Sequence, residues 1–258
     1  MSAVAFFNSA RAYKRELTGE PGAKLSQEDV DVLNKATVDR WKPAGREKLH
    51  LRSATALKAP GAFYGALRGS LGRLSQDQVD GINALLAATS AAGWPISWVA
   101  YALATAWHET AHTMQPIKEL GGSTYFHRMY DIQGERPKKA KELGNLAPGD
   151  GARFAGRGYV QLTGRINYVN AGLALGIDLP ENPDLAMQPD VAAKILIWGM
   201  AGGKFTTKAL KDYLPANRAA SVGEFTAARR IINGQDRARS IADLALKFQT
   251  ALALGEWG

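Results

Sequence analysis

Apolar positions recur every three to four residues along most of the chain, which is the spacing of amphipathic helices. The best candidate for an extended backbone is residues 153–163, where several glycines indicate a backbone that a ligand approaches closely. The pattern therefore predicts a mainly α fold. The predicted helices cover residues 5–16, 26–40, 62–69, 75–91, 95–111, 137–143, 168–175, 189–201, 221–232 and 237–253.

An uncharged tract runs over residues 82–107 and is long enough, by count, to cross a membrane. Gly93, Trp94 and Pro95 divide it into two pieces that are each too short to span. We therefore expect two buried helices joined by a turn, and no stable membrane insertion.

Two ten-residue segments resemble each other: LSQEDVDVLN at residues 25–34 and LSQDQVDGIN at residues 74–83. In the second, Ser75 and Gln78 have the spacing of a helix capping box. The likeness indicates either two similarly capped helices or a duplicated helical unit, repeated in part at residues 62–89. We expect a small N-terminal helical module at residues 1–60 and a second, larger domain at residues 61–258.

The amino-acid composition excludes several kinds of site and favours some kinds of partner. The chain has no cysteine, which excludes a disulfide scaffold, a zinc ribbon, a thiol nucleophile and an iron–sulfur site. The formal charge of +8 favours polyanionic partners such as nucleic acid, anionic lipid or an acidic wall polymer, unless the protein is simply basic and soluble. The first 20 residues lack the pattern of a secretion signal, so we expect a cytoplasmic protein unless another factor releases it.

Residues 108–112 read His-Glu-Thr-Ala-His, the pattern of a zinc peptidase helix. On a helix, His108 and His112 would share a face and bind zinc, with Glu109 as the general base. The extended form of the motif is absent, because Gln115 and Lys118 stand at its later positions. A third zinc ligand would have to be a carboxylate, and the candidates are Glu135 and Glu142.

The second interpretation makes Glu109 the general acid of a glycosidase. It follows an almost wholly apolar helix, where burial and the negative end of the helix dipole both favour a protonated carboxyl. A second carboxylate must then face it across the substrate. We expect this to be Glu119, on the loop after Pro116. The competing carboxylates lie among lysines and arginines: Glu135 and Glu142.

Residues 149–168 form a glycine-rich segment that presents Gln161, Thr163 and Asn167 at close spacing. Amides and hydroxyls of this kind suit sugar hydroxyls and N-acetyl groups, which carry no charge to pair. The segment is not a phosphate loop, because it lacks the Gly-Lys-Ser/Thr sequence.

Residues 107–110, 156–163 and 167–168 together resemble glycoside hydrolase family 19, which comprises plant-type chitinases and endolysins of phages that infect Gram-negative bacteria. Residues 231–234 match the family's Ile-Asn-Gly motif, and the resemblance covers about residues 62–250. Residues 101–119 look more like the phage branch, in agreement with the absence of cysteine. Plant-type members have Thr-Gly-Gly where residues 111–113 read Ala-His-Thr.

The resemblance implies a lysozyme-like, two-lobed helical fold with a sugar cleft. It implies that Glu109 donates the proton, that Thr163 orients the attacking water and, less directly because that loop varies in length, that Glu119 is the second carboxylate. It places these further residues in or beside the cleft: His108, Arg157, Gln161, Asn167, Tyr168 and Asn233.

The expected function is that of an endolysin, which hydrolyses β-1,4 glycan strands of peptidoglycan with inversion. Inverting enzymes hold their two carboxyl groups roughly 6.5–9.5 Å apart. The alternatives are a chitinase acting on chitin oligomers and the zinc peptidase. We expect residues 61–258 to be the catalytic domain, and we hypothesise that the module at residues 1–60 contacts the cell wall. We expect a monomer without cofactor or metal, with peptidoglycan and not nucleic acid as its partner. We expect it in the host cytoplasm and, after release through a holin-type pore, in the periplasm.

Overall fold

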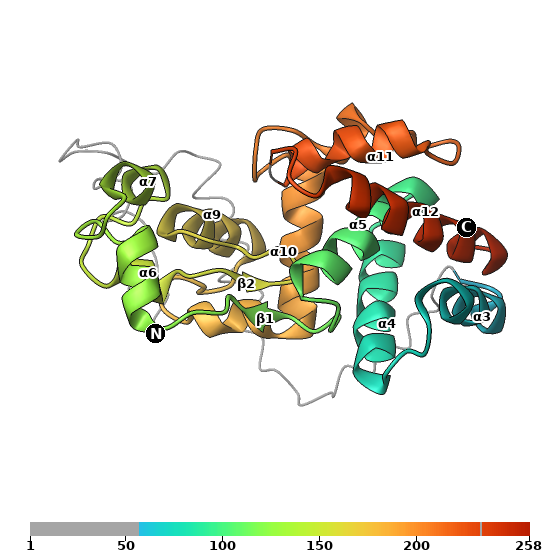
Figure 1. Ribbon diagram of the computed structural model, residues 1–258, viewed down its shortest axis with the longest axis horizontal. Helices are drawn as coiled ribbons and strands as arrows, with labels where there is room; N and C mark the ends of the chain where they lie inside the picture. The colour runs from blue at the N-terminus through green and yellow to red at the C-terminus, as the bar shows by residue number, and fades with distance from the viewer. Residues whose placement is uncertain (1–56, 233) are drawn as a thin grey trace. The chain divides into compact units, whose positions relative to one another are not determined.

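The computed structural model describes residues 57–232 and 234–258 (Figure 1). The helices predicted at residues 5–16 and 26–40, the first copy of the repeat and Asn233 lie outside the described residues, as does most of the predicted module at residues 1–60. The described chain forms two compact units. Unit 1 comprises residues 119–156 and 162–185, and unit 2 comprises residues 57–118, 157–161 and 186–258 without residue 233.

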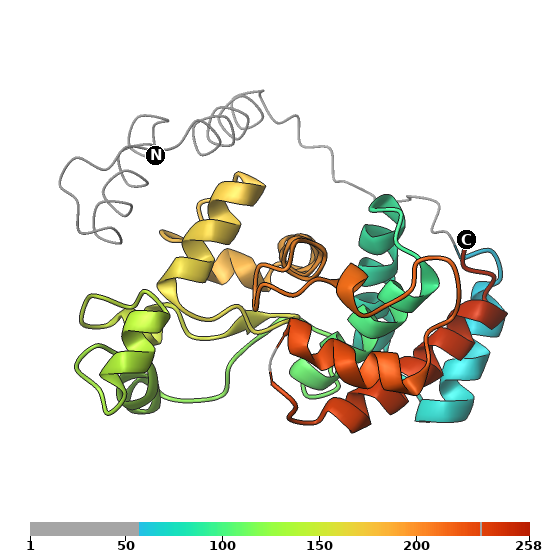
Figure 2. The same cartoon turned by 90° about the horizontal axis from the view of Figure 1, so that it is seen from above.

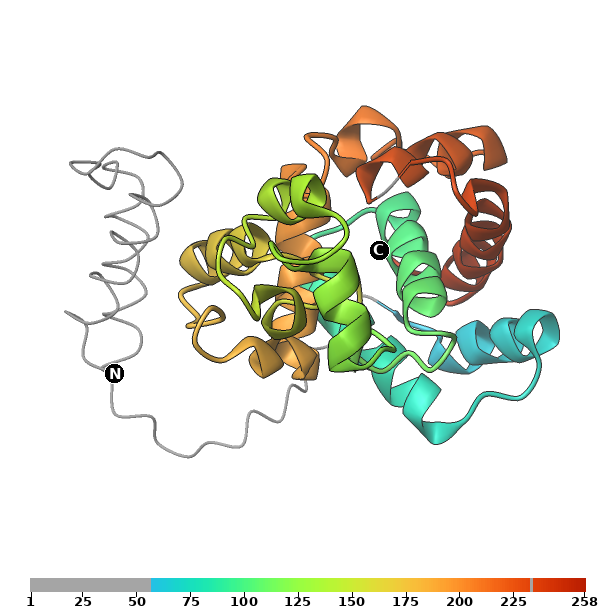
Figure 3. The same cartoon turned by 60° about the vertical axis from the view of Figure 1, so that its left-hand side comes forward.

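Unit 2 is built around helix α5 (Ile96–Glu109), in which every residue from 97 to 107 except the half-buried Trp98 is buried. A helix that is apolar on nearly all sides is stable only when other elements cover it. Helices α4 (Gln76–Ala91) and α12 (Ala238–Leu254) pack against it (Figure 3). Around these lie α3 (Pro60–Leu71), which packs on α12 (Figure 2), with α10 (Pro189–Gly202) on α4 and α11 (Val222–Ala228) on α12.

The uncharged tract forms two helices, as the sequence predicts. Helix α4 ends at Ala91, Gly93 adopts a left-handed conformation, and Pro95 precedes the first turn of α5. The predicted capping box is also confirmed, because the Ser75 hydroxyl accepts the Gln78 N–H while the Gln78 side chain accepts the Ser75 N–H. Among the described residues, no helix has both the length and the apolar character needed to cross a membrane.

Unit 1 contains four short helices: α6 (Ser123–Tyr130), α7 (Pro137–Glu142), α8 (Asp150–Arg153) and α9 (Arg165–Leu175). Helix α6 packs against α7 and α8. The sequence pattern does not predict α6, which has only eight residues, half of them apolar, or the four-residue α8. It placed the start of α9 three residues too late.

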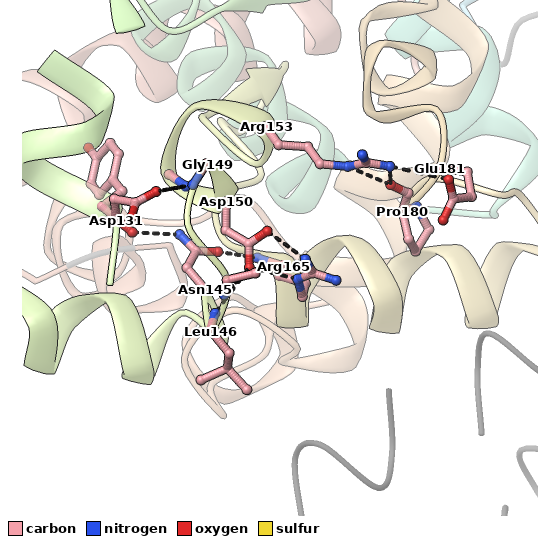
Figure 4. Close-up of polar contacts among 12 residues, drawn as sticks. Asp131, Asn145, Leu146, Gly149, Asp150, Arg153, Arg165, Pro180 and Glu181 are labelled. Atoms are coloured by element: carbon pink, nitrogen blue, oxygen red, sulfur yellow. Dashed lines mark hydrogen bonds and ion pairs between the residues drawn. The ribbon is translucent and has the colours of Figure 1, made fainter. Parts of the chain in front are cut away.

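Buried carboxylates hold the loops of unit 1 together (Figure 4). Asp131 accepts the N–H groups of Gly149 at 2.7 Å and Gly151 at 3.2 Å. Asp150 accepts the N–H groups of residues 146 and 147 and pairs with the Arg165 guanidinium, with 2.8 Å between Nε and Oδ2. These contacts satisfy the buried carboxylates and fix the loops to one another.

The described residues are mainly α-helical, so the predicted fold class is confirmed. Their one sheet pairs β1 (Ile117–Lys118) with β2 (Arg157–Gly158), antiparallel, in the register Ile117 to Gly158. The extended prediction over residues 153–163 is therefore right for two residues only. The predicted helix at 221–232 is α11 followed by a short 3-10 turn, η3 (Arg229–Ile231).

Candidate active site

Glu109 is the last residue of α5, two residues before the helix end that the sequence predicts. The chain leaves the helix because Ala111, His112 and Met114 all have positive φ angles, at 49°, 69° and 55°. Side chains with a Cβ rarely adopt this conformation, so surrounding contacts must hold it.

Those contacts come from the N-terminal half of α4. The Gln78 side chain donates to the His112 carbonyl at 2.8 Å, and the Gln115 side chain donates to the Asp77 carbonyl at 2.6 Å. Gly81 lies directly against the turn, where a Cβ atom would meet the Met114 carbonyl oxygen at 1.7 Å. The turn that ends α5 is thus built on α4, and it determines where Glu109 stands.

The prediction of a zinc-binding helix is wrong, because this turn ends α5 between the two histidines. His108 lies on α5, but His112 lies beyond its end with φ 69°, so the two rings do not share a helical face. The His112 ring instead stacks on Trp107, with centroids 5.6 Å apart. Within residues 57–232 and 234–258, no group of three or more His, Asp or Glu side chains is placed to hold a metal ion.

A buried arginine holds the Glu109 carboxylate. Nη1 of Arg229 lies 2.8 Å from Oε1 of Glu109, and Nε of Arg229 donates to the Asp236 carbonyl. The arginine side chain is 3% exposed and the glutamate side chain 18% exposed, so water screens the pair weakly. Arg229 is not among the site residues predicted from the sequence. Its position shortly before the Ile-Asn-Gly motif is the one local feature that could have indicated it.

His108 precedes Glu109 and is half-buried. Burial lowers the pKa of its imidazole, and the neighbouring Arg229 acts in the same direction, against the opposing influence of Glu109. The ring is therefore neutral at pH 7 and can donate or accept a hydrogen bond beside Glu109.

Glu119 lies in unit 1, and three donors hold its carboxylate. Oε1 accepts the hydroxyls of Tyr130 at 2.9 Å and Tyr125 at 3.4 Å, and Oε2 accepts the Gly156 N–H at 3.2 Å. Burial, followed by the hydrogen bond to Glu119, raises the pKa of Tyr130, which keeps its hydroxyl a donor. Both tyrosines lie on α6, the helix that the sequence analysis missed.

The competing carboxylates are surface groups, as expected. Glu135 and Glu142 are each 67% exposed and pair with Arg128 and Lys139 respectively. Neither has the set of donors that holds Glu119.

Thr163 lies at the start of α9, again in unit 1. Its carbonyl accepts the Asn167 side-chain amide at 2.7 Å, and Gly164 follows it with φ 90°, where a Cβ would meet Leu143 at 2.7 Å. Asn145, which is fully buried, accepts the Arg165 N–H and donates to the Tyr130 carbonyl. One amide thus connects the helix that holds Glu119 to the turn that holds Thr163.

Tyr168 is fully buried, although the resemblance places it along the cleft. Its hydroxyl donates to the Ala155 carbonyl at 2.8 Å and its ring packs on Phe154. The buried side chain therefore supports the glycine-rich segment through Ala155 and is not accessible to a ligand.

Gln161 and Arg157 belong to unit 2. Gln161 has φ 52°, and its side-chain amide donates to the carbonyls of Ile117 and Gly158, one from each strand. Arg157 is 4% exposed and stands opposite Lys118 in the sheet. The Gln161 side chain therefore braces the two-stranded sheet.

The structure thus gathers the predicted residues into two groups, each described within its own unit. Unit 2 holds His108, Glu109, Arg157 and Gln161. Unit 1 holds Glu119, Thr163, Asn167 and Tyr168. Asn233 lies outside the described residues.

The family model for chitinase class I, of glycoside hydrolase family 19, matches residues 89–235, which is more than half of the chain. The chain belongs to glycoside hydrolase family 19. The matched stretch contains Glu109, Glu119 and Thr163. It also contains α5, which ends at Glu109, and α6, whose tyrosines donate to Glu119. It does not include the residues before 89.

Relatives within the family match shorter stretches. The acidic 27 kDa endochitinase of Solanum lycopersicum is 37% identical over 93 residues, which are 33% of this chain and 38% of that protein. Chitinase 11 of Oryza sativa subsp. japonica is 46% identical over 57 residues, 22% of either chain. The chain therefore spans well under half the length of these relatives. A crystal structure of a chitinase C mutant has a TM-score of 0.50 and 26% identity, over 76% of this chain and 77% of that one. With this match, the predicted lysozyme-like helical fold is confirmed.

Proposed function

We propose that this protein is an inverting glycosidase that hydrolyses the β-1,4 glycan strands of bacterial peptidoglycan, as an endolysin does. The observation that carries the proposal is the pair of restrained carboxylates inside the family match. Arg229 holds Glu109, and two tyrosines with a backbone N–H hold Glu119. Restrained carboxylates suit catalysis because their positions need not be organised again at each turnover.

In the proposed reaction, Glu109 acts as the general acid. Glu109 starts as the protonated carboxyl, in which Oε1 accepts the Arg229 N–H and Oε2 carries the proton to the glycosidic oxygen; the carboxylate that remains then pairs with Arg229. The bond between the anomeric carbon and that oxygen breaks. A water molecule oriented by Thr163 attacks the anomeric carbon from the opposite face, and Glu119 takes its proton.

Charge favours peptidoglycan over chitin. The chain carries a formal charge of +8, and peptidoglycan bears carboxylates whereas chitin is neutral. The alternative, hydrolysis of chitin oligomers, is favoured by the names of the relatives, which are endochitinases and chitinases. The proposal further includes a monomeric protein that is made in the host cytoplasm and reaches the periplasm through a holin-type pore.

Mass spectrometry of digests tests the function. Purified peptidoglycan and N-acetylglucosamine oligomers are each incubated with the protein and with Glu109→Gln. The proposal expects new reducing ends from peptidoglycan, no products with the variant, and the α-anomer first in proton NMR. Cleavage of the oligomers alone would establish the chitinase alternative. Release of amines without reducing ends would overturn both glycosidase hypotheses, peptidoglycan hydrolysis and chitin hydrolysis.

A further inference from the structure

Unit 2 contains a pocket of about 750 Å³ near the start of α5. Its walls are the turn that precedes α5, the loop over residues 216–219, and Trp257. Helix α5 has 14 residues, so the pocket and Glu109 lie at opposite ends of a helix about 20 Å long. The pocket is therefore separate from the Glu109 end of the unit.

Hydrogen bonds hold the walls of this pocket in place. The Trp257 indole N–H donates to the Trp94 carbonyl at 3.0 Å, and the Trp98 indole N–H donates to the Leu214 carbonyl at 3.2 Å. The Ser97 hydroxyl donates to the Pro215 carbonyl. These bonds tie the helix start to the loop and to Trp257, so the pocket is formed before any ligand arrives.

The charged side chain in the lining already has a partner. Arg218 forms two hydrogen bonds with Glu224, at 2.6 and 3.0 Å. The bonds from Arg218 and then from Ser221 lower the pKa of Glu224 to about 2, so the pair stays ionised at neutral pH. The other polar side chains of the lining are neutral, namely Ser90 and Asn217. An ionic ligand would therefore find no uncompensated side-chain charge here.

We propose that this pocket is a second, non-catalytic binding site for the glycan, which takes one or two N-acetylated sugar units. A pyranose ring has an apolar face that packs on the half-buried Trp257 indole and on Pro95. Its hydroxyl and acetamide groups need neutral partners, which the exposed Asn217 amide supplies. The identity of the glycan rests on the proposed function.

Such a site increases the adsorption of the protein to the glycan and does not change the hydrolysis step itself. Binding of the strand at the pocket raises the effective concentration of its other segments around the same molecule. The effect applies to long or insoluble glycans and not to short soluble ones.

Two tryptophans make this site measurable in the full-length chain. The protein has six tryptophans, and in a ¹H–¹⁵N NMR spectrum the indole N–H of Trp257 reports on the pocket while that of Trp107, beside His108, reports on the Glu109 end. Tri-N-acetylchitotriose is titrated into Glu109→Gln, which prevents hydrolysis. The proposal expects a saturable shift of the Trp257 signal. It expects Asn217→Ala to weaken that response at least threefold and leave the Trp107 response unchanged.

Asn170→Ala removes an exposed amide from unit 1 and is the matched control, expected to leave both responses unchanged. A Trp107 shift with a silent Trp257 signal overturns the pocket and leaves the proposed function standing. A Trp257 shift with a silent Trp107 signal supports the pocket and counts against the catalytic assignment. A Trp257 response that Asn217→Ala does not weaken also overturns the pocket.

Discussion

The Tyr130 hydroxyl donates a hydrogen bond of 2.9 Å to Oε1 of Glu119, while Tyr125 approaches the same oxygen at 3.4 Å. The two bonds differ in length on one carboxylate, and hydrogen bonds weaken as they lengthen. Tyr130 is also the residue whose carbonyl Asn145 holds. We infer that Tyr130 is the main positioning residue for Glu119.

Replacement of Tyr130 by phenylalanine is expected to lower kcat about tenfold. A hydrogen bond to a charged group is worth roughly 1.5–3 kcal/mol, and about 1.4 kcal/mol corresponds to a factor of ten in rate. The measurement is the rate of reducing-end release from purified peptidoglycan. Tyr125→Phe is the matched control, with an expected loss below about threefold. The reverse order of the two variants would contradict the inference.

The ion pair of Arg229 and Glu109 makes a prediction about stability. Arg229→Met leaves Glu109 without its buried partner and is expected to lower the free energy of unfolding by about 3 kcal/mol. Combination with Glu109→Gln removes the unpaired charge, so the double variant is expected to regain most of that loss while it stays inactive. Urea unfolding of the four proteins measures the coupling. Additive losses would mean that the pair contributes nothing to folding.

Asp131 predicts a dependence of stability on pH. Burial alone would raise the pKa of Asp131, but the N–H groups of Gln133, Gly151 and Gly149 outweigh it and lower that pKa. A carboxyl with a lowered folded-state pKa contributes stability above its unfolded value, near 3.9, and loses it as the pH falls through the folded value.

Asp131→Asn turns an amide N–H₂ toward groups that can only donate, so it is expected to lower Tm at pH 7. The difference in Tm between parent and variant is expected to shrink as the pH falls below about 4. Thermal unfolding at a series of pH values measures it. A difference that stays constant down to pH 2.5 would refute the assignment.

Gly149 and Gly164 differ both in backbone conformation and in the space around them. Gly149, at φ 92° and ψ −13°, is left-handed, whereas Gly164, at φ 90° and ψ 140°, lies outside the left-handed region and has Leu143 atoms within 3 Å of its Cβ position. Gly149→Ala is expected to cost about 1 kcal/mol, for the left-handed conformation alone. Gly164→Ala is expected to cost on the order of 3 kcal/mol and to reduce activity, because Thr163 adjoins it. Urea unfolding measures both costs, and equal costs would contradict the expected order.

His112 distinguishes the glycosidase from the zinc peptidase. The residue is exposed and lies beyond the end of α5. His112→Ala is expected to keep glycan hydrolysis within about twofold of the parent, whereas loss of a zinc ligand abolishes metallopeptidase activity. The assay compares His112→Ala with Glu109→Gln, and with the parent protein in EDTA. Loss of activity in EDTA would restore the metal hypothesis.

Features that depend on neighbours in the chain could be predicted from the sequence. The capping box at Ser75, the break at residues 93–95 and the long amphipathic helices were correct because helix periodicity and caps act over a few residues. Glu109 could also be selected, since the apolar helix before it and the surrounding motif are both local. Helices α6 and α8 have only eight and four residues, which is too short for a helical period to stand out in the sequence.

Contacts between distant segments of the chain determine where α5 ends and which groups hold the site carboxylates. Helix α5 ends at Glu109, and not two residues later, because Gln78 and Gly81 of α4 hold the left-handed turn that follows. Arg229 reaches Glu109 across 120 positions of sequence, and Asn145 reaches Arg165 across 20. Such pairs leave no periodic trace, because their hydrogen bonds form only once the fold has brought the two segments together. The residue types of the candidate site could be read from the sequence, but the donors that hold its carboxylates were set by the tertiary structure.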